Sequence, residues 1–177
     1  MTRPPRFFGR ECLDALSARA AESPRRRTNL NFHDTPEHPA NRMLNAMEPD
    51  SYVRPHRHAA AFKDETFIVV KGAFGVVLFD KDGKVSHTAV LRPGGDLIGA
   101  HLPAGVFHSI VSLEPASVFF EVKAGPYDPA AAKDWAPWAP EESAAGAGEY
   151  LGKLRQLFTS ACRDMRARIS AVNSRAR

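Results

Sequence analysis

Three histidines and one glutamate are spaced so that they could share a metal ion. His56 and His58 are two residues apart in the segment PHRH, and Glu65 follows seven residues after His58. Because side chains alternate along a β-strand, histidines at this spacing point to the same side. His108 ends the segment PAGVFH, in which Pro and Gly indicate a turn before the next strand. This mixed set of imidazole and carboxylate donors predicts a transition-metal site.

The chemistry of such a site follows from its ligand set. Four protein ligands leave part of an octahedral shell for water or substrate oxygens, and the metal then acts as a Lewis acid or lowers the pKa of bound water. Fe, Zn, Mn, Ni and Co all accept these donors, so the sequence predicts one divalent transition metal without selecting it. Cys12 and Cys162 lie far from these segments, which argues against a thiolate-rich structural zinc site.

Further polar residues could line the same site. Tyr52 and Arg54 share the parity of His56, so they either serve as general acid and anion-binding residue or simply pack and pair at the rim. Asn31 and His33 alternate with apolar residues, which indicates either an added strand that reaches the site or an Asx-type turn. Arg42 is a further candidate, and Glu121 in SVFFEVK faces either solvent or a polar cavity.

The elements that must position these residues are mainly strands. From residue 41 to 124, short apolar runs alternate with turn residues such as Asp82-Gly83, a pattern that predicts a sandwich or closed barrel. A short helix is predicted over residues 10–22 and a longer amphipathic helix over residues 149–172. We therefore expect one domain, with an N-terminal helix and arm (1–40), a barrel (41–124), a Pro/Ala-rich crossing packed on it (125–148), and a C-terminal helix with a basic tail (149–177).

The two histidine segments resemble the paired motifs of cupins. His56, His58, Glu65, Gly72 and His108 follow the motif order, although the interval before Glu65 is longer than usual and leaves Asp64 as the alternative carboxylate. The stretches 29–34, 41–58, 103–109 and 119–140 further resemble cupin-fold metalloproteins of the WbuC family. The resemblance implies a double-stranded β-helix, or jelly-roll barrel, with one divalent metal. The WbuC resemblance also favours the interpretation that Glu121 faces a polar cavity rather than solvent.

Composition and charge limit the partners. The chain has 177 residues, a net charge of +4 and no apolar run long enough to span a bilayer. Residues 1–27 carry seven arginines against three acidic residues, residues 151–177 carry seven basic residues against Asp164, and the segment between them is acidic. All seven histidines lie in that segment. Its acidic charge argues against nucleic-acid binding. Two cysteines and no evident signal segment indicate a cytoplasmic protein. The predicted partner is a small-molecule substrate.

Three functions fit these observations. The first is a metal-dependent isomerase, epimerase or lyase acting on a small polar or sugar-derived substrate, with Tyr52, His33 or Glu121 as acid or base and Arg54, Asn31 and Arg42 as substrate-binding residues. The alternatives are an Fe(II)-dependent oxygenase and a non-catalytic, metal-assisted ligand-binding module. The WbuC resemblance further implies a link to bacterial surface-polysaccharide synthesis, and the cupin resemblance is compatible with a homodimer.

Overall fold

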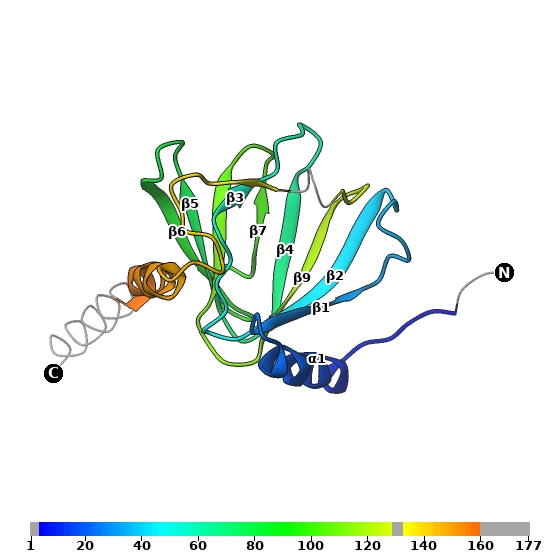
Figure 1. Ribbon diagram of the computed structural model, residues 1–177. Coiled ribbons are helices and arrows are strands. Elements are labelled where there is room, and N and C mark those ends of the chain that lie inside the picture. Colours follow the sequence, from blue (N-terminus) through cyan, green and yellow to red (C-terminus); the bar gives the residue numbers. More distant parts are fainter. Residues whose placement is uncertain (1–3, 129–132, 160–177) are drawn as a thin grey trace, which may run out of the picture.

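Two five-stranded antiparallel sheets form most of the structure (Figure 1). The computed structural model describes residues 4–128 and 133–159. The first sheet has the order β1-β2-β9-β4-β7, with bounds Arg27–Asn31, Ala40–Met47, Ser117–Ala124, Glu65–Lys71 and Gly99–Leu102. The second has the order β10-β3-β8-β5-β6, with bounds Asp134–Trp135, His56–Arg57, Phe107–Ser112, Phe74–Phe79 and Val85–Leu91.

The strand order defines a jelly roll. Without the added edge strands β1 and β10, the two sheets read β2-β9-β4-β7 and β3-β8-β5-β6. Each sheet therefore interleaves strands from the first and second halves of the chain, as two Greek keys in one sandwich require. The prediction of a mainly β jelly-roll barrel is confirmed. The β5–β6 hairpin turns at Asp82-Gly83 as predicted, and Gly83 there has a φ of 87°.

The space between the sheets is divided between apolar and polar side chains. Phe67, Val69, Phe74 and Phe119 belong to one buried apolar cluster. Phe67 and Phe119 sit on β4 and β9. Towards one end of the sandwich, the next inward positions of these strands are polar: Glu65 on β4 and Glu121 on β9. The apolar part stabilises the sandwich, and the polar part forms the site described below.

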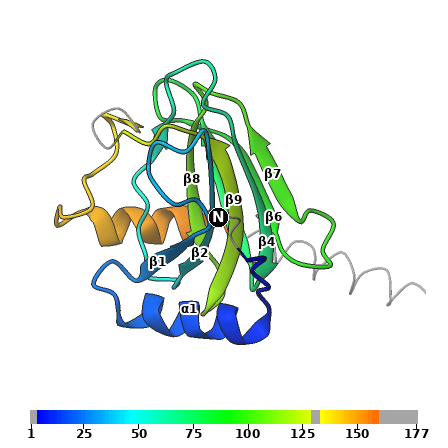
Figure 2. The same cartoon turned by 90° about the vertical axis from the view of Figure 1, so that its right-hand side faces the viewer.

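Helix α1, Arg10–Glu22, covers the first sheet from outside (Figure 2). Leu16 and Ala20 are buried and belong to one cluster with Leu44, Ala46 and Val118 of β2 and β9. The helix has the residue range predicted from its apolar spacing. It lies on the side of the sheet opposite the inter-sheet core, so it supports β2 and β9 without reaching the site.

A second helix packs against the second sheet. Residues 147–159 are helical, and Leu151, Leu154 and Phe158 join a buried cluster with Val77 of β5. Gly75 permits this packing, because a Cβ at that position would overlap the Phe158 ring. The C-terminal helix predicted over residues 149–172 is therefore confirmed as far as residue 159. Its remainder, with Cys162, lies outside the described residues.

The segment before this helix packs on the barrel. Ala136 and Ala139 are buried, and the Trp138 ring lies 4.9 Å from that of Phe79 and 6.0 Å from that of Phe107. Strand β10 pairs this segment with β3, so it passes directly beside His56. Within the described ranges, no helix has the length and hydropathy needed to cross a membrane.

Candidate metal centre

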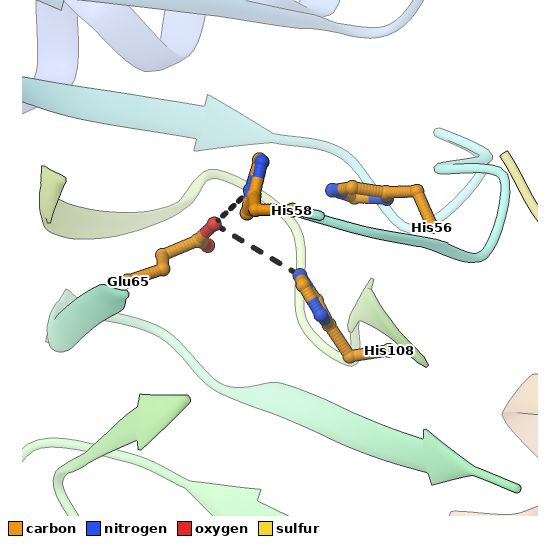
Figure 3. Close-up of side chains that lie close together, drawn as sticks. All are labelled: His56, His58, Glu65 and His108. Atoms are coloured by element: carbon orange, nitrogen blue, oxygen red, sulfur yellow. Dashed lines mark hydrogen bonds and ion pairs between the residues drawn. The ribbon is translucent and has the colours of Figure 1, made fainter. Parts of the chain in front are cut away.

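Three neighbouring strands bring the predicted ligands together. His56 on β3 is the cross-strand partner of His108 on β8, so their rings lie side by side with centroids 4.6 Å apart. His58 follows directly after β3, and Glu65 is the first residue of β4. Figure 3 shows the four side chains converging from these elements. Strand pairing and the position of His58 directly after β3 thus bring the four side chains together between the two sheets.

The four side chains form a compact, buried group. One ligand atom from each of His56, His58, Glu65 and His108 lies within 4.8 Å of the others. All four residues are at most 8% exposed. His58 Nε2 is 2.8 Å from Glu65 Oε2, and His108 Nε2 is 3.9 Å from the same oxygen. Burying several donors at this separation is the arrangement that a shared metal ion stabilises.

Backbone contacts orient two of the imidazoles for coordination. His56 Nδ1–H donates to the carbonyl of Arg54 at 3.0 Å, and His108 Nδ1–H donates to that of Val106 at 2.9 Å. Each contact fixes the tautomer and leaves the Nε2 lone pair directed into the group. His108 Nε2 is buried and has no hydrogen-bond partner among the described residues. A metal ion would satisfy this nitrogen, so the residues present fit one.

The electrostatics keep the ligands in their binding forms. Burial lowers the pKa of His56 well below its ordinary value, and burial likewise lowers that of His108. Burial alone would raise the pKa of Glu65, but the hydrogen bond with His58 and the nearby charges of His108 and Lys123 outweigh it and lower that pKa. Neutral imidazoles and an ionised carboxylate are the forms that bind divalent metals.

Glu65 rather than Asp64 joins this group. Asp64 points elsewhere: its Oδ1 accepts from the Ala104 backbone N–H at 2.9 Å, and its side chain is half exposed. Residues 59–64 form a turn between β3 and β4, and this turn accommodates the longer interval after His58. Gly72 ends β4 with a φ of 71°, a left-handed conformation that favours glycine.

Two other candidates lie away from the group. The Tyr52 hydroxyl donates to the carbonyl of Pro140 at 3.0 Å, and its ring belongs to the apolar cluster under the second helix. Arg54 donates to the carbonyl of Ala136 at 2.9 Å and lies 3.7 Å from Glu141. Residues 52–55 are not in a strand. The parity shared with His56 therefore does not carry Tyr52 or Arg54 to the ligands.

A polar cavity of about 480 Å³ collects three of the remaining candidates. Asn31, His33 and Glu121 all line it, whereas Arg42 does not. Asn31 is on β1, so the segment is an added strand rather than only a turn. The Arg42 guanidinium lies 3.3 Å from His38 Nε2. The lining strands β1, β2 and β9 belong to the sheet that also carries Glu65.

Most residues that line this cavity are not among the sequence-based candidates. Asn41, Lys123 and Lys133 are among them. Lys133 lies in the stretch 119–140 that resembles the WbuC family, but no local pattern singles it out as a site residue. Asn41 has the parity of Asn45 on β2, and this alternation is the one signal that could have located it.

Comparisons with known proteins give partial matches. A family model described as "Domain of unknown function (DUF6016)" matches residues 8–91. KdgF from Halomonas sp. is 24% identical, with a TM-score of 0.46 over 60% of this chain and 84% of that protein. A variant of oxalate decarboxylase from Bacillus subtilis is 18% identical, with a TM-score of 0.47 over 61% of this chain and 27% of that one. No curated protein matches the chain.

The fold and the site together define a class of protein. It is a jelly-roll protein with a buried group of three histidines and one glutamate that could hold a metal ion.

Proposed function

We propose that this protein is a metal-binding cupin in which His56, His58, Glu65 and His108 hold one divalent transition metal. One observation carries the proposal: four buried ligand atoms lie within 4.8 Å of one another. When bound, the metal would supply Lewis-acid chemistry to a substrate oxygen. The ligands come from three strands of two sheets, so the barrel itself holds their geometry.

The surrounding residues adapt the site to a small polar substrate. Trp135 of β10 lies beside His56 with ring centroids 5.5 Å apart, so it shields one side of the group from water. Glu121 lines the cavity and accepts a hydrogen bond from Asn45 at 2.8 Å. His33 also lines the cavity, and its Nδ1 accepts from the Arg42 backbone N–H at 3.1 Å. Glu121 and His33 are therefore the proposed acid or base residues.

Metal binding by paired variants tests this proposal. We expect the purified protein, stripped and titrated with Mn²⁺, Co²⁺ or Zn²⁺, to bind about one equivalent of metal, and His108→Ala to lose at least tenfold in affinity. His87→Ala is the matched control, since His87 is exposed on β6. Equal affinity in His108→Ala and His87→Ala would contradict the assignment.

The reaction that we propose is directed at a sugar. We propose isomerase, epimerase or lyase chemistry on a sugar-derived substrate, in a cytoplasmic protein of the WbuC family linked to surface-polysaccharide synthesis. The motif stretches at 29–34, 41–58, 103–109 and 119–140 support the family assignment. The polar cavity beside the metal group supports a hydroxylated substrate.

Turnover of free and nucleotide-linked sugars by the metal-loaded protein tests the reaction. We expect product formation that Glu121→Gln reduces while metal content stays at the wild-type level. Oxygen consumption by the Fe(II)-loaded protein would instead identify an oxygenase. Metal binding without turnover of any sugar in the panel would argue for a binding module and against an enzyme of this kind.

A further inference from the structure

The cavity beside the metal group carries more positive than negative charge. Arg25, Arg27, Lys123 and Lys133 line it, against the carboxylates of Glu121 and Asp34. Most of the cations are already engaged by acidic side chains. Arg25 and Arg27 lie 2.9 and 2.5 Å from Glu142, and Lys123 lies 2.6 Å from Glu121. The charge available to a ligand therefore depends on the remaining lysine.

Lys133 is that remaining cation. It has no hydrogen bond or ion pair to a residue in the described ranges, and its Nζ lies 5.2 Å from the Trp135 ring centroid. Burial, followed by the neighbouring charge of Lys123, lowers its pKa to about 8. Lys133 is partly exposed, and keeping an unpaired ammonium group largely out of water is costly. An anion in the cavity would offset that cost.

Asn41 provides a second, independent indication of a ligand. It is only 1% exposed, and both its Oδ1 and its Nδ2 lack a hydrogen-bond partner among the described residues. Buried side-chain amides are almost always hydrogen-bonded. Because this amide lines the cavity, a ligand that both donates and accepts hydrogen bonds would satisfy it. Hydroxyl groups do both.

The sheet register connects these residues to the metal group. Asn41 on β2 is the cross-strand partner of Lys123 on β9, and Lys123 is in turn the partner of Glu65 on β4. Cross-strand partners place their side chains on the same face of a sheet. The row Asn41, Lys123, Glu65 therefore runs from the cavity to a predicted metal ligand.

We propose that this cavity binds a small hydroxylated carboxylate, a sugar acid, with its carboxylate at Lys133 and its hydroxyl groups at Asn41. The inference rests on the proposed function, because it places that anion beside the metal group. A monoanion fits better than a phosphate. Lys133 is the one lysine of the cavity without an acidic partner among the described residues, and Glu121 would repel a second negative charge.

Binding of three probes to the full chain tests the proposal by calorimetry. We expect D-glucuronate to bind at least about tenfold more tightly than D-glucose, since it adds a charge-assisted contact. Lys133→Met should abolish this preference and Lys133→Arg should keep it. Asn41→Ala should weaken the binding of both glucuronate and glucose. Lys81→Met changes an exposed loop lysine paired with Asp82 and should leave both affinities unchanged. Thermal melts of each variant confirm that it is folded.

Three results would overturn the proposal: equal binding of glucuronate and glucose, an unchanged preference in folded Lys133→Met, or tighter binding of D-glucose 6-phosphate than of glucuronate. A metal titration of the same samples separates the two claims. Metal binding without glucuronate binding removes the sugar-acid site and leaves the proposed metal centre. Glucuronate binding that depends on Lys133, in a protein that takes up no metal, removes the proposed metal centre and leaves the sugar-acid site.

Discussion

At the scale of single residues, the metal group and part of the cavity were predictable. His56 and His58 are two residues apart, so strand alternation predicts that they share a side, and His108 stands in a second segment of its own. Tyr52 shares their parity but packs in the apolar core, because residues 52–55 are not in a strand and parity then carries no information. Lys133 lies within a stretch that carries the family resemblance, but nothing local singles it out, and the pairing of β10 with β3 brings it to the site.

Lys133 should make stability depend on pH. Its pKa of about 8 lies below the ordinary 10.5, so the unfolded chain binds the proton more strongly than the folded protein does. The resulting cost to folding is fully present below pH 8 and fades as the pH rises towards 10.5. In metal-free protein at pH 7, Lys133→Met should therefore raise the free energy of unfolding by about 1–3 kcal/mol. Urea denaturation at pH 7 and pH 10 measures this difference. A gain that is equal at both pH values would contradict the account.

At the scale of elements, apolar spacing predicted the helices, while the pairing of strands had to come from the structure. Helix α1 was predictable because Leu16 and Ala20 recur at helical spacing on a short segment. The alternation of Asn31 and His33 left a strand or a turn open, because either conformation satisfies it. Pairing of β1 with β2 places Asn31 in a strand, whereas His33 lies in the bend beyond its end. Cross-strand register depends on contacts distant in sequence, so no local pattern could supply it.

Docking of the second helix should stabilise the sheet that carries His56 and His108. Leu154 is 4% exposed in the cluster with Val77 and Phe158, so Leu154→Ala should cost about 2–5 kcal/mol through lost burial and the cavity it leaves. Arg155→Ala, on the exposed side of the same helix, is the matched control and should change stability by less than about 0.5 kcal/mol. Equal effects of the two substitutions in chemical denaturation would show that the helix is not docked in this way.

At the scale of the whole molecule, the two sheets meet around one polar site. β3 and β8 of one sheet and β4 of the other each contribute ligands, so a metal ion would cross-link the sandwich. The net charge of +4 is a poor guide to this arrangement, since the charge that matters is local. Three histidines and one glutamate converge on the metal group, and Lys133 and Lys123 lie in the cavity beside it.

Metal binding should therefore raise the melting temperature. At a free metal concentration about 100-fold above Kd, linkage predicts about 2.7 kcal/mol of added stability, or roughly 5–10 °C for a chain of this size. Thermal unfolding followed by circular dichroism, with and without Zn²⁺ or Mn²⁺, measures the shift. An equal rise in His108→Ala would place the stabilising ion elsewhere.

X-ray absorption spectroscopy of the zinc-loaded protein tests the central claim most directly. The account predicts about one zinc per chain with three imidazoles and one carboxylate, and zinc–nitrogen distances of about 2.0–2.1 Å. His108→Ala should reduce the imidazole contribution by about one third while His87→Ala leaves it unchanged. A spectrum without imidazole scattering, or one that is the same in His108→Ala, would contradict a metal centre built from His56, His58, Glu65 and His108.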